Sequence, residues 1–286
     1  MNQPALLPNR ALLRIGGGDA EGFLQNLVTC DIEGLRPDAL TLGALLTPQG
    51  KILFEFFLAR EGDGFVIDID ASMRADFLKR LTFYKLRADV HLAPVDDAVA
   101  VLPGGDGSGA SDRSRLGPRC FADPRHPDLG LRIWGHAEAY GAPSSAYHAR
   151  RIACGVPEMM VDFQASSAFP HEVLMDQYAG AGVDFTKGCY VGQEVVSRMQ
   201  HRGTARSRFV IVHAQHDLPA RGTSITANDR DIGRMGSAAG GHGLALLRLD
   251  RAHSAIVGGV PILAGETPVT VTLPDFVQFS WPADVA

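Results

Sequence analysis

The stretch from residue 185 to residue 203, FTKGCYVGQEVVSRMQHRG, places a thiol where it could react. Two valines and a methionine, each four residues apart, predict a helix from about residue 190 to residue 200. Cys189 would then lie at the helix N-terminus, where free backbone N–H groups favour an anion. Lys187 adds a positive charge two residues away, and both effects lower the pKa of a thiol. Gly188 lets a ligand approach the backbone closely or supplies a left-handed conformation. The pattern therefore makes Cys189 and Lys187 candidate catalytic residues.

A second interpretation of the same stretch is structural. A free cysteine often packs as a small apolar side chain, here beneath a helix cap. Tyr190 and Phe185 are equally typical of core packing, and Glu194 can pair with Arg198 one helical turn away. The residues alone leave both interpretations open.

The remaining cysteines give no metal motif. Cys30, Cys120 and Cys154 are far from one another and from Cys189, and no C-x-x-C is present. We expect no intrinsic metal or cluster, because a closed site needs four compactly placed ligands, although distant cysteines could still converge. Scattered thiols fit a reducing compartment. The sequence begins without a signal-peptide pattern and has no run of 18 apolar residues, so we expect a cytoplasmic protein that does not contact a membrane.

Length and charge limit the remaining classes. A chain of 286 residues predicts two or three domains, and a net charge of −5 gives no bulk attraction to nucleic acid. A small basic run, Arg202, Arg206 and Arg208, is either a solvated linker face or a weak partner or RNA surface. RNA contact is therefore only a weak expectation.

The elements that must position the thiol follow a recognisable order. Strands are predicted at 11–15, in a hairpin over 43–59, at 64–71 and at 87–93, with helices beginning at Asp19 and Ser72. This order is a split β-α-β pattern, an antiparallel sheet covered by helices, and so an α+β fold. Residues 103–128 are rich in glycine, serine and proline and predict a loop-rich excursion, and 144–155 predicts another helix.

The sequence pattern changes after residue 203. Short β-type runs with glycine-rich turns between them predict a small barrel. We therefore divide the chain into an α+β region over 1–203, expected to form two subdomains, and a C-terminal β-barrel domain over 204–286.

The block KGCYVGQE resembles the signature of the YgfZ-type folate-binding proteins, relatives of the glycine-cleavage aminomethyltransferase, or T-protein (GcvT). The segments RIACGVPEMMVDF, FPHE, FLQNLVTCDI, LLTPQGKI and ADPRHPDLGLRI are similar to further family segments, so the resemblance covers most of residues 10–205. It implies a T-protein-like core and a bound tetrahydrofolate. It also implies a role as helper of iron–sulfur enzymes, including those that modify tRNA. The implied partners are reduced folate and iron–sulfur client enzymes or assembly proteins.

A folate site needs a carboxylate for the pterin edge, arginine or lysine for the glutamate tail, and apolar walls. Each candidate acid could instead be a surface residue or a helix cap. Arg151 matches the family's arginine, and Asp128 lies near the segment that binds pterin in the T-protein. The expected folate contacts are Asp128, Arg151, Glu172, Gly188, Tyr190, Gln193 and Glu194.

One segment departs from the aminomethyltransferases. They carry an acidic pair after the glycine-containing hairpin, whereas this chain has Phe54 and Glu55 in GKILFEF. The loss of one acid argues against aminomethyl transfer, which needs a proton-handling group. Three functions stay open: a folate-binding helper in iron–sulfur cluster assembly or repair, a folate-dependent aminomethyl or one-carbon transferase, and a folate-independent thiol redox protein. No second cysteine lies near Cys189, which argues against a simple dithiol mechanism.

Overall fold

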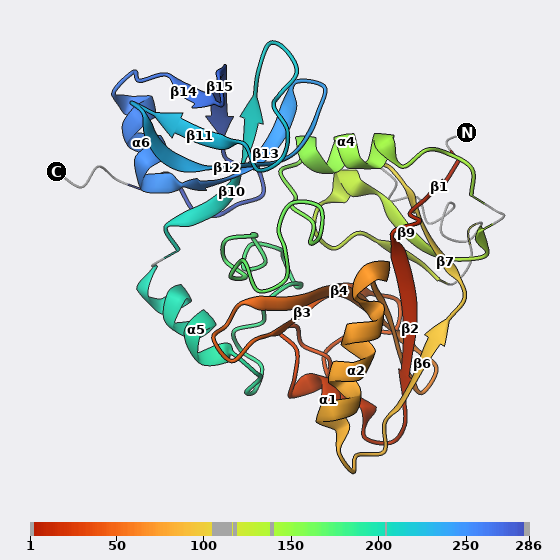
Figure 1. Cartoon of the computed structure of the whole chain (residues 1–286). Coiled ribbons are helices and arrows are strands. Elements are labelled where there is room, and N and C mark those ends of the chain that lie inside the picture. Colours follow the sequence, from red (N-terminus) through yellow and green to blue (C-terminus); the bar gives the residue numbers. More distant parts are fainter. Residues whose placement is uncertain (1–2, 105–115, 117–118, 138–139, 204, 283–286) are drawn as a thin grey trace.

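Two antiparallel sheets and a closed barrel make up the molecule (Figure 1). The structure, a computed structural model, describes residues 3–104, 116, 119–137, 140–203 and 205–282. The predicted α+β core with a C-terminal barrel is confirmed. None of the described helices combines the length and the apolar character needed to cross a membrane.

The first sheet has five strands in the order β3-β4-β5-β2-β6. Its outer face is covered by two helices, because Phe54 and Phe56 of β4 pack on Phe77 of α2 with ring centroids 5.0 and 5.4 Å apart. Helix α2 follows a short 3-10 turn, and its N-cap is Met73, not Ser72 as expected. Asp70 caps the 3-10 turn by accepting from the backbone N–H of Ser72. The elements are β2 (Arg10–Gly16), α1 (Ala20–Gln25), β3 (Leu40–Leu46), β4 (Ile52–Glu61), β5 (Gly64–Asp70), η1 (Ala71–Met73), α2 (Arg74–Lys85) and β6 (His91–Val95).

A second sheet of four strands, in the order β1-β7-β9-β8, packs against the inner face of the first. Its elements are β1 (Ala5–Leu6), β7 (Ala98–Leu102), β8 (Cys120–Ala122) and β9 (Leu131–Gly135), with the 3-10 helix η2 (Pro127–Leu129) and the helix α4 (Ser145–Ala153). Much of the predicted excursion over 103–128 lies outside the described residues. Its last part is not loop, because β8 pairs with β9 there.

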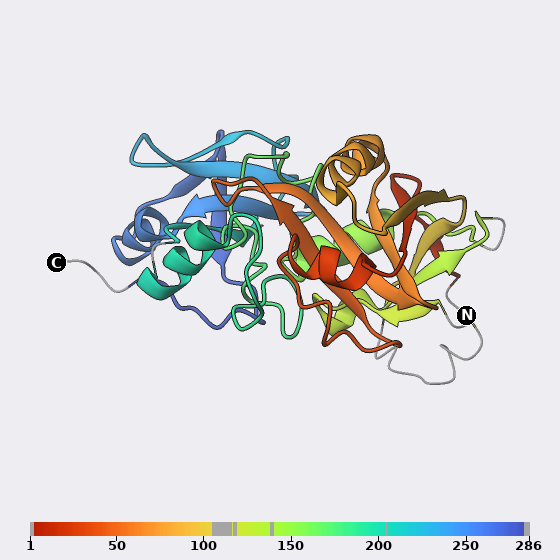
Figure 2. The ribbon, with the colours of Figure 1, turned by 90° about the horizontal axis from the view of Figure 1, so that it is seen from below.

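The chain between α4 and α5 (Gln193–Arg202) contains no long helix or strand. In Figures 1 and 2 it runs through the middle of the molecule, between the barrel and strands β3 and β4. Backbone hydrogen bonds fix it on both sides: the N–H of Gly182 donates to Leu42, and the N–H of Phe209 in the barrel donates to Glu172. This segment carries the thiol motif.

The barrel closes in the order β10-β13-β12-β11-β14-β15 and contacts α4 through β12 and β13. After β15 the chain returns to the rest of the molecule, where Phe276 stacks on Tyr178 and the N–H of Gln278 donates to Gln177 at 2.8 Å. The elements are β10 (Ser207–His213), β11 (Ser224–Ala227), β12 (Arg230–Ala239), β13 (His242–Arg248), α6 (Leu249–Val257), β14 (Ile262–Ala264) and β15 (Thr267–Thr272).

Candidate functional site

The thiol motif forms a fixed loop on the surface. The carboxylate of Asp184 accepts from the N–H groups of Thr186 and Lys187, at 2.6 and 2.9 Å. Burial of Asp184 would raise its pKa, but these hydrogen bonds outweigh burial and hold the pKa below its usual range. The backbone N–H of Asp184 donates in turn to Thr29, so the loop is tied to the chain that follows α1.

Lys187 does not point at the thiol that it was expected to ionise. Its ammonium donates to the backbone carbonyls of Val28 and Cys30, both at 2.7 Å. Burial lowers the pKa of Lys187. The lysine therefore holds the loop onto the neighbouring chain, and its predicted catalytic role finds no support in this geometry.

Cys189 is exposed, whereas Cys30, Cys120 and Cys154 are buried. Helix α5 begins at Gln193 and not at Tyr190, so the expectation that the thiol lies at the helix N-terminus is wrong. The reason is Gly192, whose φ of +82° is left-handed and interrupts the helical pattern. A Cβ on Gly192 would lie 2.5 Å from the carbonyl oxygen of Thr47, so only glycine allows the loop to touch the β3–β4 turn.

The other motif residues have separate environments. Tyr190 is buried, and its hydroxyl has no hydrogen-bond partner among the described residues. Gln193 is half-buried at the start of α5, and Glu194 is exposed, 3.9 Å from Arg198. Gly188 is exposed and a Cβ there would meet open space, so neither a left-handed conformation nor a neighbouring protein atom requires glycine.

Three residues expected to bind folate lie elsewhere. Arg151 is completely buried and its two terminal nitrogens have structural partners: it donates to Asp162 and to the carbonyl of Val156, both at 2.6 Å, and to Ser237 of the barrel at 3.0 Å, while its Nε lies 3.5 Å from Oε2 of Glu158. It joins α4 to the barrel and is not free to hold a glutamate tail. Asp128 is exposed on η2.

Glu172 also has a structural partner. Its carboxylate accepts from the N–H of Phe169 at 2.9 Å, and burial raises its pKa. The structure thus brings Lys187, Gly188, Cys189 and Tyr190 together on one loop, while Asp128, Arg151 and Glu172 lie on other segments and make other contacts.

A buried polar cluster between the two sheets was missed by the sequence analysis. Asp68 accepts from Arg10 at 2.6 Å and from Arg132 at 2.7 Å, while Arg125 forms two hydrogen bonds to Asp123. The guanidinium groups of Arg10, Arg125 and Arg132 all lie over the ring of Phe57, at 5.6, 4.7 and 4.0 Å from its centroid. Their charges are therefore paired and stacked on one aromatic side chain.

Two carboxylates complete this central polar cluster. Burial raises the pKa of Glu55 to about 7, although Arg125 opposes the effect. Glu158 is also buried, but Arg151, Arg10 and Arg125 outweigh desolvation and lower its pKa to about 2. At neutral pH, then, Glu55 can exchange a proton while Glu158 stays ionised.

Several atoms of the cluster have no hydrogen-bond partner among the described residues. The atoms without a hydrogen-bond partner include Oε2 of Glu158, which lies 3.5 Å from Nε of Arg151, the hydroxyl of Tyr178, Nη1 of Arg125 and Nε of Arg132. Burying a polar atom without a hydrogen bond is costly, and such atoms in a native protein indicate a missing water or ligand. The cluster can accept a molecule that offers both donors and acceptors.

A small pocket of about 270 Å³ lies beside the thiol loop. It is lined by Cys30, Asp31, Tyr178, Gly180, Ala181, Val183, Asp184, Phe185 and Thr186. Its volume is near the lower end of the roughly 300–1,000 Å³ typical of ligand pockets. Tyr178 therefore lines this pocket, and its hydroxyl is also one of the atoms in the central polar cluster that have no hydrogen-bond partner among the described residues.

A sequence signal for the cluster exists. Glu55 interrupts the apolar run ILFEFFLA of β4, and alternation along that strand turns Phe54 toward helix α2 while Glu55 lies on the opposite face. The acid that remains in the GKILFEF segment is thus the one that faces the centre. The pairing of Arg10, Asp68 and Arg132 has no comparable signal, because these residues are far apart in the chain.

Comparison with known proteins agrees with this architecture. Residues 206–279 match the family described as CAF17, C-terminal beta-barrel domain. The solved glycine cleavage system aminomethyltransferase T from Bartonella henselae is similar over 97% of this chain and 87% of its own, with a TM-score of 0.72 and 15% identity. This likeness shows the aminomethyltransferase fold.

Two curated relatives share more sequence. The iron–sulfur cluster assembly factor IBA57 homolog of Pyricularia oryzae is 33% identical over 296 residues, which span 91% of this chain and 75% of the relative. The human iron–sulfur cluster assembly factor IBA57 is 30% identical over 312 residues, 96% of this chain and 84% of its own. Both names describe mitochondrial proteins, so they do not support the cytoplasmic expectation. The expected relationship holds at the level of the fold, but the matching relatives are not specifically of the YgfZ type. This chain belongs to the family of the iron–sulfur cluster assembly factor IBA57.

Proposed function

We propose that this chain acts in iron–sulfur cluster assembly and that the Cys189 thiol is the group that engages the cluster. The observation that carries the proposal is that Cys189 is the one exposed cysteine of the four, on a loop fixed by Asp184, Lys187 and Gly192. Thiolates are the preferred protein ligands of iron–sulfur clusters. The names of the relatives support the same role.

One thiol cannot hold a cluster alone. A [2Fe–2S] cluster takes four protein ligands, and the other three cysteines of this chain are buried. The remaining ligands would come from the protein that delivers or receives the cluster. The cluster is then cargo shared between two chains, with Cys189 at their contact.

Reduced folate is the second part of the proposal, with the central polar cluster as its site. The amino-pyrimidinone edge of a pterin offers parallel N–H donors to a carboxylate and an acceptor to an arginine. Glu158, Arg125 and Tyr178 each have an atom suited to such contacts and without a hydrogen-bond partner among the described residues. The aminomethyltransferase fold is consistent with a folate ligand. Glu55 would hold or release a proton beside it.

We keep iron–sulfur enzymes that modify tRNA as the proposed clients. A direct RNA contact gains little support, because Arg208 of the basic run is buried and forms two hydrogen bonds to Asp176, both at 2.8 Å. Protein contact at the thiol loop is the simpler route to such clients.

The thiol is tested by complementation of a strain that lacks the protein, scored by the activity of an iron–sulfur tRNA-modifying enzyme. Cys189→Ala should abolish complementation while changing the free energy of unfolding by no more than about 0.5 kcal/mol, since the side chain is exposed. Cys120→Ala, which removes a buried thiol on β8, is the matched control and should complement. Full complementation by the Cys189→Ala variant would overturn the proposed role.

The folate site is tested separately by titration with tetrahydrofolate. Tyr178→Phe removes a hydroxyl that has no partner in the described chain, so the fold should be kept while affinity falls by about tenfold. Tyr190→Phe removes an equally partnerless hydroxyl beneath the thiol loop and should leave affinity unchanged. An effect of Tyr190→Phe alone would move the folate site to the motif, and no binding at about 1 mM folate would remove it.

A second candidate function is a folate-dependent one-carbon or aminomethyl transfer, and Glu55 favours it. Its central position and a pKa of about 7 suit a group that exchanges protons at neutral pH. Replacement of the neighbouring acid by Phe54 therefore does not remove proton handling from the site. Formation of methylenetetrahydrofolate from an aminomethyl donor, lost in Glu55→Gln, would support this reaction; no turnover by the wild-type chain would exclude it.

A further inference from the structure

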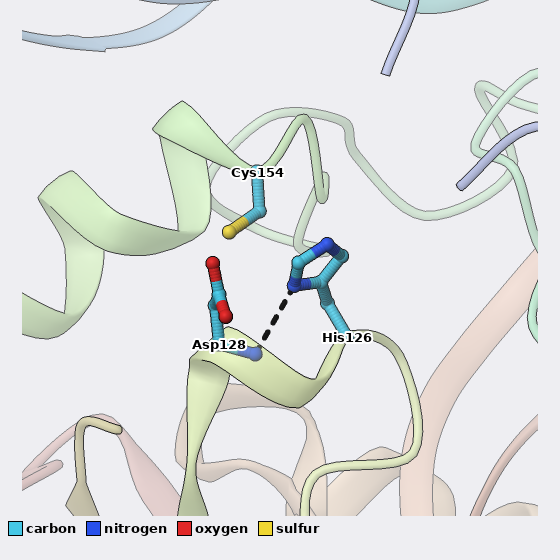
Figure 3. Close-up of side chains that lie close together, drawn as sticks. All are labelled: His126, Asp128 and Cys154. Atoms are coloured by element: carbon cyan, nitrogen blue, oxygen red, sulfur yellow. Dashed lines mark hydrogen bonds between the residues drawn. The ribbon is translucent and has the colours of Figure 1, made fainter. Parts of the chain in front are cut away.

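A cluster of three metal-ligating side chains lies where η2, the end of α4 and the segment after the barrel meet (Figure 3). One ligand atom each from His126, Asp128 and Cys154 lies within 4.8 Å of the others. Figure 3 shows the imidazole, the carboxylate and the thiol turned toward a common space. His126 and Cys154 are buried, and Asp128 is exposed.

The local backbone conformation brings these three residues together. His126 is extended because it precedes Pro127, the first residue of η2, and the short helix brings Asp128 back over the imidazole. Cys154 is the residue that ends α4, directly before Gly155. Gly155 has a φ of +78°, and a Cβ there would lie 2.5 Å from Pro274. Glycine therefore lets the segment after the barrel pass beside the thiol.

Hydrogen bonds around His126 select the tautomer that can bind a metal. The N–H of Asp128 donates to Nδ1 at 3.2 Å, so Nδ1 carries a lone pair and the ring proton is on Nε2. Nε2 lies 3.3 Å from Oδ1 of Asp275, which can accept that proton. A carboxylate behind the imidazole is the usual arrangement for a metal-ligating histidine, because it fixes the ring and makes the other nitrogen more basic.

We propose that His126, Asp128 and Cys154 bind a divalent transition-metal ion such as Zn²⁺, with Asp275 as the residue that positions the imidazole. A set of nitrogen, sulfur and oxygen donors suits Zn²⁺ and its neighbours, whereas Mg²⁺ and Ca²⁺ prefer oxygen alone. Bond lengths of about 2.0–2.3 Å put tetrahedral ligand atoms roughly 3.3–3.8 Å apart, so only small side-chain rotations would close the site.

Three protein ligands leave the fourth tetrahedral position for solvent on the side of the exposed Asp128. The ion would displace the thiol proton of Cys154 to solvent and take the Nδ1 lone pair in place of the long hydrogen bond from Asp128. This site departs from the expectation of no intrinsic metal, which rested on the spacing of the cysteines while allowing that distant cysteines could converge. It uses no residue of the proposed iron–sulfur cluster site or of the proposed folate site.

The test is titration of the reduced, chelator-treated full chain with Zn²⁺ by calorimetry, and with Co²⁺ by absorption. We expect one ion per chain and a thiolate-to-cobalt charge-transfer band that disappears in Cys154→Ser. Asp128→Asn, an exposed change that leaves the fold intact, and His126→Gln should each weaken Zn²⁺ binding at least about tenfold. Asp275→Asn should weaken it about 10–100-fold and leave the cobalt–thiolate band in place, as expected for a positioning residue.

Two controls separate this site from other donors. Cys189→Ser removes the exposed thiol, and His242→Ala disrupts the exposed pair in which His213 and His242 have Nδ1 atoms 3.0 Å apart. Neither should change the stoichiometry or the band. A band that survives Cys154→Ser, or Zn²⁺ binding that is lost in His242→Ala or Cys189→Ser, would overturn the proposal.

Discussion

Replacing Glu55 by glutamine tests the central polar cluster through the pH dependence of stability. Glutamine has the shape of the protonated acid and can still accept from the N–H of Met159, which lies 3.2 Å from Oε1 of Glu55. Burial raises the pKa of Glu55 from 4.5 to about 7 in the folded chain, with Arg125 opposing the effect. The variant therefore removes a titration while changing little else.

The sign of the pH dependence of stability follows from how many protons the folded and unfolded chains bind. Between about pH 4.5 and pH 7 the unfolded chain has released the Glu55 proton and the folded chain still holds it, so the wild type loses stability as pH rises. Each pKa unit corresponds to about 1.4 kcal/mol, so the loss from this group is about 3 kcal/mol across that window. Below about pH 4.5 both states are protonated and the contribution is constant.

The assay is urea unfolding of the two proteins in parallel from about pH 4.5 to about pH 8, followed by circular dichroism. The stability of Glu55→Gln relative to wild type should rise by about 3 kcal/mol over this range. Glu266→Gln, an exposed change in the turn between β14 and β15, is the control and should follow the wild type. A difference between Glu55→Gln and wild type that does not change with pH would refute the reasoning.

Three further outcomes are expected. Cys189 should react with iodoacetamide faster than the other cysteines because it is exposed and they are buried; mass spectrometry that finds Cys30, Cys120 or Cys154 labelled first would contradict this. Asp68→Asn leaves two buried arginines without their anion and should cost about 3–5 kcal/mol in urea unfolding, whereas a loss below about 1 kcal/mol would argue against the network. Gly192→Ala should cost at least about 1 kcal/mol, and Gly188→Ala, where space is open, close to nothing; equal stability of both variants would disprove the strained turn.

Much of the fold follows from local patterns in the sequence. The turn at Pro48 and Gly50 predicts the β3–β4 hairpin, and the two strands pair as expected. The short apolar runs after residue 206 predict a barrel, which closes. These features depend on residues that are neighbours in the chain, so their period and turn chemistry are readable directly.

The candidate site was less predictable because its parts are distant in the chain. Arg151 is an arginine in a helix with no visible acid nearby, and only the folded chain brings Asp162 and Ser237 to it. The helical pattern of apolar residues extends to Val191, although helix α5 begins only at Gln193. The pattern cannot reveal that Gly192 adopts a left-handed conformation, which interrupts the helix. The exposure of Cys189 rests on the fold as a whole, which no spacing of residues encodes.

The return of the chain after β15 has a consequence for biosynthesis. Residues 274–279 supply Phe276 against Tyr178 and the backbone group that meets Gln177, yet the ribosome makes them only after the whole barrel. Until then, the face of the earlier domains around Tyr178 lacks its cover. The nascent chain therefore cannot complete its first domains before the barrel has been synthesised.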